Sequence, residues 1–475
     1  MSAERQPPPA AAALFPAAAE RERLDDLVTR ALSERAGRAA RGPVMPALDK
    51  ARFRAELERF DFTSPQPLEA LIDWVTTQLE HGVVHMNNPR YFGLFNPGAN
   101  FPAQVADRIA GAFNPQLASS GSSPAPVAIE AHVVRAIAQR AGLPPDSGGH
   151  FTTAGSEANY TALVCALTRA APGFATDGVR AFPGAPVMYT SRECQPAWFK
   201  IAHQAGIGRR ALKLVPTDNR GELDCTALSG MIARDRAAGE VPVLVSATAG
   251  TTGGGVVDPL SRCAAIAREA GAWYHVDAAW GGAALCSPRL RGVLAGIELA
   301  DSLTIDAHKW FATTMGCGMF ITRYPAVLSE AFRVAADFMP STVAALDPYL
   351  NTMQWSRRFM GLRLFLSLAA AGWDGYAAHV ERAVEVISIV KERLLARSWR
   401  ALNDSQLAVL CVAPPPGFPP IREVVRRVLA SGRAWVAVTT FAGQEAIRIC
   451  ATHGEIAASD IDALVDALSG AGGGE

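Results

Sequence analysis

An aspartate and a lysine follow two consecutive apolar segments of the chain. Asp277 lies in HVDAAW (275–280), and Lys309 lies in TIDAHKW (304–310). A lysine amine can hold an aldehyde as a Schiff base, and a carboxylate can keep a pyridine nitrogen protonated so that the ring withdraws electrons. Pyridoxal 5′-phosphate (PLP) needs both groups at one site. The two residue types therefore indicate PLP chemistry, provided that the fold brings them together.

The two apolar segments have the composition of neighbouring buried strands. Ala272–Ala279 and Ser302–Ala307 are of strand length, and Ser287–Gly296 between them can form a short crossover helix. A βαβ unit of this kind has parallel strands, and open α/β sheets bind ligands at the carboxyl ends of such strands. Each segment carries its polar residues at that end. We therefore expect Asp277 and Lys309 to face one pocket.

The sequence resembles the group II PLP-dependent amino acid decarboxylases, which include the aromatic-amino-acid, glutamate and histidine decarboxylases. HVDAAWGG (275–282) and the triplet His308-Lys309-Trp310 stand here as they do in that family, and the resemblance runs from about residue 67 to residue 468. It implies an α/β fold of fold-type I, with an aminotransferase-like large domain around a seven-stranded, mostly parallel sheet. An N-terminal helical arm, a small C-terminal α+β domain and a homodimer with shared active sites are also implied.

The resemblance places further residues around PLP. HFTTAGSEANYTAL (150–163) has the pattern of a strand, a turn and a helix, whose first backbone N–H groups can bind the phosphate. Gln195 stands where most of the family stacks a histidine on the pyridine ring, and some bacterial glutamate decarboxylases also have glutamine there. Because an amide does not titrate near neutral pH, this residue is expected to position PLP without acting as an acid or base. The expected cofactor-binding residues are Ala154, Gly155, Ser156, Gln195, Thr248, Asp277, Ala279, His308 and Lys309.

Other residues are expected to act on the substrate. Arg357, in QWSRRF (354–359), matches the place where the family binds the α-carboxylate, and Arg358 is the alternative. Tyr349 stands where relatives have a loop tyrosine that returns a proton to Cα, although packing explains it as well; His308 is the other donor. The expected catalytic residues are thus Lys309, His308, Asp277 and Tyr349, and the expected substrate-binding residues are His85, Tyr91, Phe92 and Arg357.

Composition argues against several other classes of protein. The 475 residues carry 45 basic and 45 acidic side chains, so no basic excess suggests a nucleic-acid partner. No apolar run reaches the ~18 residues that predict a membrane span. The cysteines are scattered without a CxxC pair, which predicts no metal and no disulfides but free thiols in the cytoplasm. The Ala/Pro-rich segment Pro7–Ala19 has the pattern of a disordered tail and not of a signal peptide.

Spacing predicts the order of the elements. Helical periodicity marks an arm before residue 90, and seven strand patterns then alternate with helices up to about residue 323. The predicted domains are 1–90, 91–360 and 361–475. Predicted helices are Glu20–Gly37, Lys50–Phe60, Leu68–His81, Arg357–Ala371, Gly375–Ser398 and Ala458–Leu468, and late strand patterns cover 407–413, 434–441 and 446–452.

The resemblance to the group II decarboxylases implies decarboxylation of an L-amino acid to its amine and CO2. The aromatic residues between Tyr91 and Phe95 favour a bulky or aromatic substrate, whereas Arg90 would suit an acidic side chain. An aminotransferase, which would use the same lysine and aspartate, and an oxidative decarboxylase that makes an aldehyde are the alternatives. A PLP-free relative used only for binding would show no visible absorbance.

Overall fold

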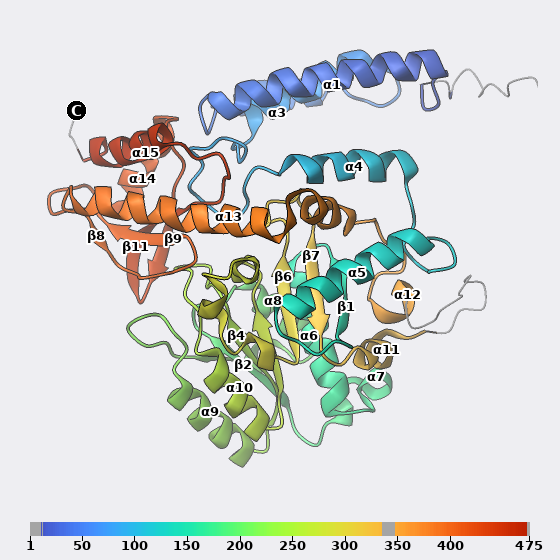
Figure 1. Cartoon of the computed structure of the whole chain (residues 1–475), viewed down its shortest axis with the longest axis vertical. Helices are drawn as coiled ribbons and strands as arrows, with labels where there is room; N and C mark the ends of the chain where they lie inside the picture. Colours follow the sequence, from blue (N-terminus) through green and yellow to red (C-terminus); the bar gives the residue numbers. More distant parts are fainter. Residues whose placement is uncertain (1–10, 12, 335–346, 473–475) are drawn as a thin grey trace, which may run out of the picture.

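The centre of the computed structural model, which describes residues 11, 13–334 and 347–472, is a seven-stranded sheet (Figure 1). Its order is β1-β7-β6-β5-β4-β2-β3. Strand β7 is antiparallel to both of its neighbours, and the remaining pairs are parallel. Each strand overlaps a predicted strand pattern. The bounds are β1 Gly148–Thr152, β2 Pro186–Ser191, β3 Leu212–Val215, β4 Val241–Thr248, β5 Trp273–Asp277, β6 Ser302–Asp306 and β7 Gly318–Thr322.

Helices cover both faces of this sheet, which is why its strands are continuous apolar runs. Every residue of β2, β5, β6 and β7 is buried. The hydrophobic cluster on one face includes residues of α6 and α8, and the cluster on the other face includes residues of α5, α9, α10 and α13. The bounds are α5 Pro124–Arg140, α6 Gly155–Ala170, α7 Phe174–Asp177, α8 Ala197–Gln204, α9 Cys225–Ala237, α10 Leu260–Glu269, α11 Ala326–Phe332 and α12 Pro348–Asn351.

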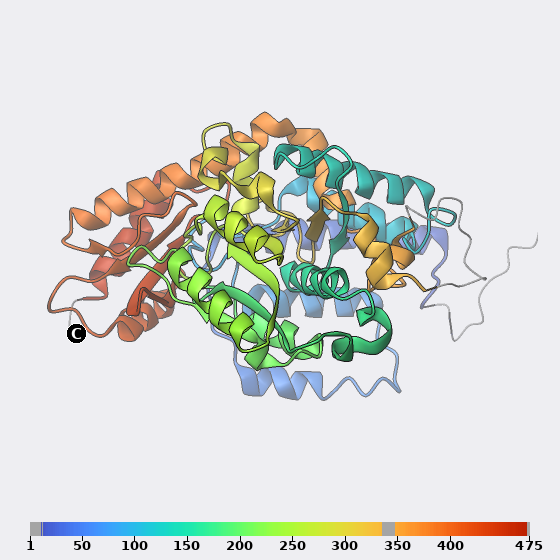
Figure 2. The same ribbon diagram turned by 90° about the horizontal axis from the view of Figure 1, so that it is seen from below.

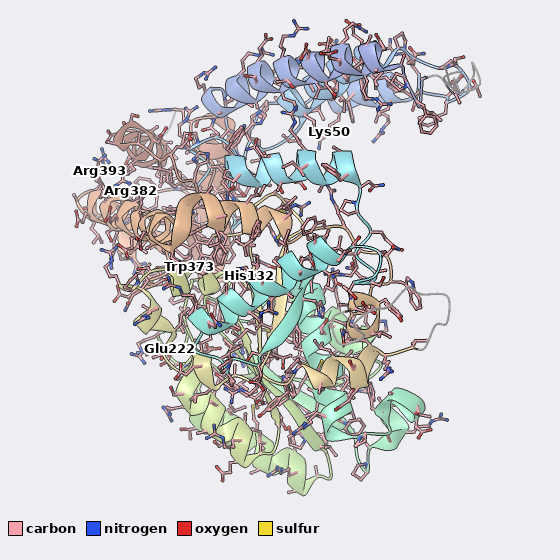
Figure 3. All side chains as sticks on the ribbon, turned by 45° about the vertical axis from the view of Figure 1, so that its right-hand side comes forward. Lys50, His132, Glu222, Trp373, Arg382 and Arg393 are labelled. Atoms are coloured by element: carbon pink, nitrogen blue, oxygen red, sulfur yellow. The ribbon has the colours of Figure 1, made fainter. Side chains whose placement is uncertain are left out.

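An arm and a smaller sheet flank the large sheet. In Figure 1, α1 (Ala18–Arg41) and α3 (Leu68–Gly82) lie side by side at one side of the molecule, with α4 (Phe101–Phe113) between them and the sheet. The long helix α13 (Leu362–Leu395) leads to the smaller sheet, and its Arg393, labelled in Figure 3, pairs with Asp462 of α15. The other bounds are α2 Lys50–Leu57, β8 Arg400–Ala401, β9 Val409–Ala413, α14 Ile421–Ala430, β10 Ala437–Phe441, β11 Gln444–Cys450 and α15 Ala458–Gly470, with sheet order β10-β11-β9-β8.

The view from below shows the small sheet packed beside the large one, at the end of α13 (Figure 2). The arm, the seven-stranded sheet and this small sheet follow one another along the chain in the predicted order. The proposed domain limits at residues 90 and 360 stay a prediction.

Two predicted helices are wrong in detail. The crossover from β5 to β6 is made of short 3-10 turns, η4 (Gly281–Cys286), η5 (Arg291–Leu294) and η6 (Ile297–Leu299). The helix expected from Arg357 begins only at Leu362, and Arg357 lies before it, in a buried ion pair with Glu130. The tail prediction falls partly on residues 1–10 and 12, outside the described residues, and α1 already begins at Ala18.

All eight cysteines are buried and free. Among the described helices, none combines the length and the apolar character that crossing a bilayer requires.

Candidate active site

The fold brings Asp277 and Lys309 together. Asp277 is the last residue of β5 and pairs in parallel register with Thr304 of β6, and Lys309 follows β6 closely. The Lys309 Nζ lies 2.9 Å from an oxygen of Asp306. Burial raises the pKa of Asp277, and the charge of Lys309 is the largest influence that opposes this rise. The predicted lysine and aspartate therefore share one electrostatic site at the carboxyl edge of the sheet.

Two hydrogen bonds fix the Asp277 carboxylate. The side-chain amide of Asn159 donates to one oxygen at 2.8 Å, and the backbone N–H of Ala279 donates to the other at 3.1 Å. Thr248, the cross-strand neighbour of Asp277 on β4, has a buried hydroxyl with no hydrogen-bond partner among the described residues. A carboxylate with fixed orientation beside an unused hydroxyl fits the ring of PLP.

The start of α6 fits a phosphate group. The helix begins at Gly155 after Ala154, whose side chain gives no cap, and Ser156 is exposed. Exposed N–H groups at the positive end of a helix bind anions. A Cβ on Gly155 would lie 2.8 Å from an oxygen of Asp306, so only glycine allows this close approach. The segment fits a phosphate, whose binding there stays a prediction, and Asp306, which was not among the predicted site residues, lies against it.

Gln195 and Ser156 line the same cavity of about 780 Å³. Gln195 is exposed, and its side-chain oxygen accepts a hydrogen bond from the backbone N–H of Ala197 at 2.5 Å. The amide is thereby held at the start of α8, close to the cradle. Its contact with the pyridine ring stays a prediction.

His308 is buried beside the lysine. Its Nδ1 lies 3.2 Å from the backbone nitrogen of Cys317, and its Nε2 lies 3.8 Å from Asp306. Burial lowers the pKa of His308, so the ring is neutral at physiological pH. A neutral imidazole next to Lys309 can relay a proton in either direction.

The structure also places Arg448, on β11, at this site. Its guanidinium stacks on the ring of Phe95 at 4.2 Å, and Lys309 Nζ lies 5.8 Å from the centre of the same ring. Arg448 is buried and donates to the carbonyl of Gly93, while Nε and the second terminal nitrogen have no partner among the described residues. Phe95 stacks on Trp280 at 4.2 Å, and Trp280 stacks on Trp310 at 4.7 Å. Buried donors without acceptors mark a place for an anionic group.

Arg448 could have been found from the sequence by one signal. It is the only charged residue in the apolar run AIRIC (446–450). A buried arginine is rare unless it is paired. The pattern identified the strand, but it could not show that the strand of the small domain reaches Phe95 and Lys309.

Arg357 has other partners. Its guanidinium is buried, lies 3.2 Å from a carboxylate oxygen of Glu130, and donates to the carbonyl of Phe151 at 2.6 Å. Arg358 instead pairs with Asp107 at the surface. Carboxylate binding by Arg357 therefore stays a prediction, and this arginine already has a carboxylate to neutralise.

The remaining predicted residues are packed. Tyr349 is buried against Trp355, with ring centres 5.1 Å apart. His85 bonds to the carbonyl of Glu80, Tyr91 stacks on Trp435, and Phe92 is fully buried. Arg90 donates to the carbonyl of Gly42 at 2.6 Å. Their roles toward a substrate stay predictions, whereas Phe95 from the same segment does face the lysine.

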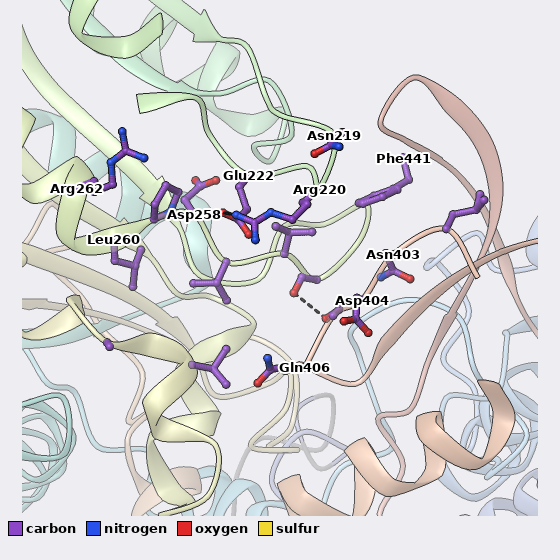
Figure 4. Close-up of a pocket in the computed structure, with 18 of the residues that line it drawn as sticks. Asn219, Arg220, Glu222, Asp258, Leu260, Arg262, Asn403, Asp404, Gln406 and Phe441 are labelled. Atoms are coloured by element: carbon purple, nitrogen blue, oxygen red, sulfur yellow. Dashed lines mark hydrogen bonds and ion pairs between the residues drawn. The ribbon is translucent and has the colours of Figure 1, made fainter. Parts of the chain in front are cut away.

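A different cavity, of about 730 Å³, lies where the loop before α10 meets the small sheet (Figure 4). Asp258, Arg220 and Asp404 line it, and none of the predicted site residues does. Asp258 connects this cavity to the site around Asp277, because its carboxylate accepts hydrogen bonds from the backbone N–H groups of Thr248 and Leu223. Among the described residues, no cluster of histidine, cysteine and acidic side chains could hold a metal ion.

Most of the chain matches one family model and known enzymes. Residues 54–411 match the family model described as the pyridoxal-dependent decarboxylase conserved domain. The chain is 32% identical over 357 residues to tyrosine decarboxylase of Oryza sativa subsp. japonica, covering 72% of this chain and 66% of that enzyme. It is 32% identical over 327 residues to L-2,4-diaminobutyrate decarboxylase of Rhizobium meliloti, covering 68% and 64%. The matched part thus spans just under two thirds of each enzyme.

Solved structures show the same fold. The crystal structure of mouse CSAD superposes with a TM-score of 0.89 at 25% identity and covers 96% of this chain and 99% of that chain. The structure of Oryza sativa TDC with PLP and tryptamine gives a TM-score of 0.90 at 23% identity over 96% and 98%.

Proposed function

The chain belongs to the pyridoxal-dependent decarboxylase family, and on that premise we propose that it converts a bulky or aromatic L-amino acid into its amine and CO2. It is a PLP-dependent amino acid decarboxylase; the class of its substrate is our proposal. The observation that carries the proposal is the joint placement of Lys309 and Arg448 beside the ring of Phe95. An amine, and a guanidinium with two nitrogens that have no partner among the described residues, suit the amino acid backbone next to an apolar side chain.

Each polar residue of the site has a task toward PLP. Bound PLP supplies an electron-withdrawing ring that accepts the electron pair left when CO2 departs. Lys309 holds the aldehyde carbon, Asp277 accepts a hydrogen bond from the ring nitrogen, and the first N–H groups of α6 hold the phosphate. Gln195 would position the ring of PLP, and the Thr248 hydroxyl would donate a further hydrogen bond to PLP.

Arg448 is proposed to bind the α-carboxylate in place of Arg357. Its Nε and one terminal nitrogen have no partner in the part of the chain that the structure describes, and together they form a fork that can bind a carboxylate with two parallel bonds. The Glu130 carboxylate already occupies Arg357 at 3.2 Å. His308, which is neutral beside Lys309, is proposed to return a proton to Cα, because Tyr349 is packed against Trp355.

The substrate class rests on the cations beside Phe95: among the residues that the structure describes, Lys309 and Arg448 are the ones that contact its ring. Arg90, which would suit an acidic substrate, donates to the carbonyls of Arg41 and Gly42. Relatives include enzymes named for tyrosine and for L-2,4-diaminobutyrate. The stacked rings of Phe95 and Trp280 favour the aromatic class.

The test is an assay of PLP-loaded protein against the common L-amino acids, measuring CO2 and the organic product. We expect tyrosine, tryptophan or phenylalanine to exceed glutamate and aspartate by about tenfold or more in kcat/KM. A preference for acidic substrates would refute the substrate class. An aldehyde product would assign the oxidative reaction, and a keto acid would assign transamination. Protein that binds no PLP would refute the function itself.

We further propose a homodimer in the cytoplasm. Among the 24 residues of α1, only Leu24 and Ala39 are buried, and α3 buries only Thr76. Leu32, Val75 and Leu79 of the arm are exposed. Because amphipathic helices require a partner surface, a second copy that covers the arm accounts for these side chains. The eight free thiols support a reducing compartment.

A further inference from the structure

A line of buried polar side chains runs from Asp277 into the large domain. Asn159 Nδ2 lies 2.8 Å from Asp277 Oδ2, and Asn159 Oδ1 lies 3.0 Å from His275 Nε2. His275 Nδ1 lies 2.8 Å from the hydroxyl of Ser302, which also lies 2.8 Å from Nε1 of Trp273. All five side chains are buried.

Sheet register and helix packing build this line. Trp273, His275 and Asp277 alternate along β5, so their side chains point to the same face of the sheet. Ser302 of β6 is the parallel partner of His275. Asn159 lies on α6, which covers that face and also begins at the phosphate cradle. The line therefore joins the aspartate to the helix that holds the phosphate.

The carboxylate end of this line fixes the direction of the hydrogen bonds. An ionised Asp277 can only accept, so Asn159 presents its NH2 to the carboxylate and its oxygen to His275. Nε2 of His275 must then carry the proton, and Nδ1 of the neutral ring accepts from the hydroxyl of Ser302. The indole N–H of Trp273 can only donate, so the same hydroxyl accepts from it, which is compatible with this tautomer.

His275 is held neutral within this chain of bonds. Burial lowers the pKa of His275 to about 3, so its ring carries no charge at physiological pH. The Thr304 hydroxyl lies 3.3 Å from Nε2 as a weaker second partner of the same N–H. Because hydrogen bonds in a chain polarise one another in a low-dielectric interior, donors aligned toward Asp277 stabilise its negative charge.

We propose that Trp273, Ser302, His275 and Asn159 form a one-way hydrogen-bond relay that keeps the Asp277 carboxylate ionised, and thereby keeps the ring nitrogen of PLP protonated. The proposal rests on the proposed function of Asp277. The four residues are positioning residues, because they act on PLP only through the carboxylate. Without the relay, burial drives Asp277 toward its neutral form, which accepts a hydrogen bond from the ring nitrogen poorly.

The test uses protein loaded with ¹⁵N-labelled PLP, whose ring-nitrogen chemical shift reports protonation directly. We expect a protonated nitrogen in the wild-type protein and loss of that signal in His275→Phe, with PLP bound about tenfold more weakly, as outer-shell hydrogen bonds elsewhere behave. His275→Gln, whose amide can both donate and accept, should restore much of the protonated signal. Ser302→Ala should produce a smaller change in the same direction, because it removes a more distant bond.

His150→Phe is the matched control. His150 is also a buried strand histidine whose pKa burial lowers to about 3, but neither ring nitrogen has a hydrogen-bond partner among the described residues. Its replacement should leave the ¹⁵N signal unchanged. If the signal of Ser302→Ala and of whichever His275 variants fold equals that of the wild type, the relay is refuted. An unprotonated nitrogen in the wild-type protein would instead refute the proposed role of Asp277.

Discussion

Lys309 is the side chain on which covalent attachment of PLP depends. Its Nζ is held by Asp306 at 2.9 Å beside Asp277. Lys309→Ala should abolish the label that borohydride fixes between PLP and the protein, as measured by mass spectrometry of the peptides. Lys200→Ala is the control, because Lys200 lines the cavity of Gln195 without facing Asp277. A label on Lys200 in the wild-type protein would show that the lysine is misassigned.

The two buried arginines should respond in opposite ways. Arg448→Ala should raise KM by about a hundredfold while PLP stays bound, because it removes a charged hydrogen-bonding partner of the substrate, worth ~3 kcal/mol. Arg357→Ala leaves the buried Glu130 without its cation and should lower the free energy of unfolding by about 3 kcal/mol. Denaturant unfolding and steady-state kinetics separate the two. If Arg357→Ala instead lost substrate binding at unchanged stability, the carboxylate site would belong to Arg357.

Asp258 should make stability depend on pH. Burial raises the pKa of Asp258 from 3.8 to about 7, so the folded state binds the proton more tightly than the unfolded state. Its contribution to the free energy of unfolding is therefore fully present below about pH 4 and is lost as pH rises to 7. Unfolding of the wild type and of Asp258→Asn across that range should show the smaller pH dependence in the variant. Equal slopes would contradict the prediction.

Among the secondary-structure elements, those that carry the site were predictable and those that complete it were not. The strands β5 and β6 are apolar runs that end in polar residues, so Asp277 and Lys309 could be placed together from the sequence alone. The crossover between them contains Pro288 and three glycines within 281–292, and it forms turns instead of a helix. The helices α4, α5 and α14 lie outside the predicted elements.

The site residues that could not be predicted from the sequence have partners that are distant along the chain. Asn159 and Arg448 reach the site through packing of α6 and β11 against distant segments, and neither has a local signal for its partner. Arg357 was predicted from a family motif, but its buried contact with Glu130, 227 residues away, is a property of the folded chain. Local patterns therefore identified the cofactor, whereas the arrangement around the substrate required the tertiary structure.

The kink of α13 should be sensitive to substitution. Gly372 has φ 65° and ψ 178° within this helix, a conformation essentially restricted to glycine. Gly372→Ala should lower the free energy of unfolding by about 1–3 kcal/mol, although no described residue lies within 4 Å of the added Cβ. Gly230→Ala, in the regular helix α9, should raise it by about 0.5–1 kcal/mol. Denaturant unfolding measures both, and a stabilising Gly372→Ala would show that the kink is not retained.

For the molecule as a whole, the exposed apolar side chains of the arm predict that two copies of the chain associate through it. Replacing two exposed apolar side chains in the double variant Val75→Asp/Leu79→Asp should convert the proposed dimer to a monomer in sedimentation velocity and reduce activity. Val179→Asp is the control, since Val179 is similarly exposed but lies in the large domain, outside the arm. A wild-type monomer, or a double variant that remains dimeric, would contradict the arm interface.

The aromatic stack beside the lysine also has an optical consequence. Trp280 and Trp310 lie parallel, 4.7 Å apart, and Trp280 also stacks on Phe95, whose ring lies beside Lys309 and Arg448. Indole emission overlaps the absorption of a pyridoxyl chromophore. Energy transfer from these indoles to PLP bound at the same site would therefore be efficient. Binding of PLP should therefore lower the intrinsic tryptophan fluorescence of the protein. Trp280 and Trp310, two of the nine tryptophans, would then report occupancy of the site without any added dye.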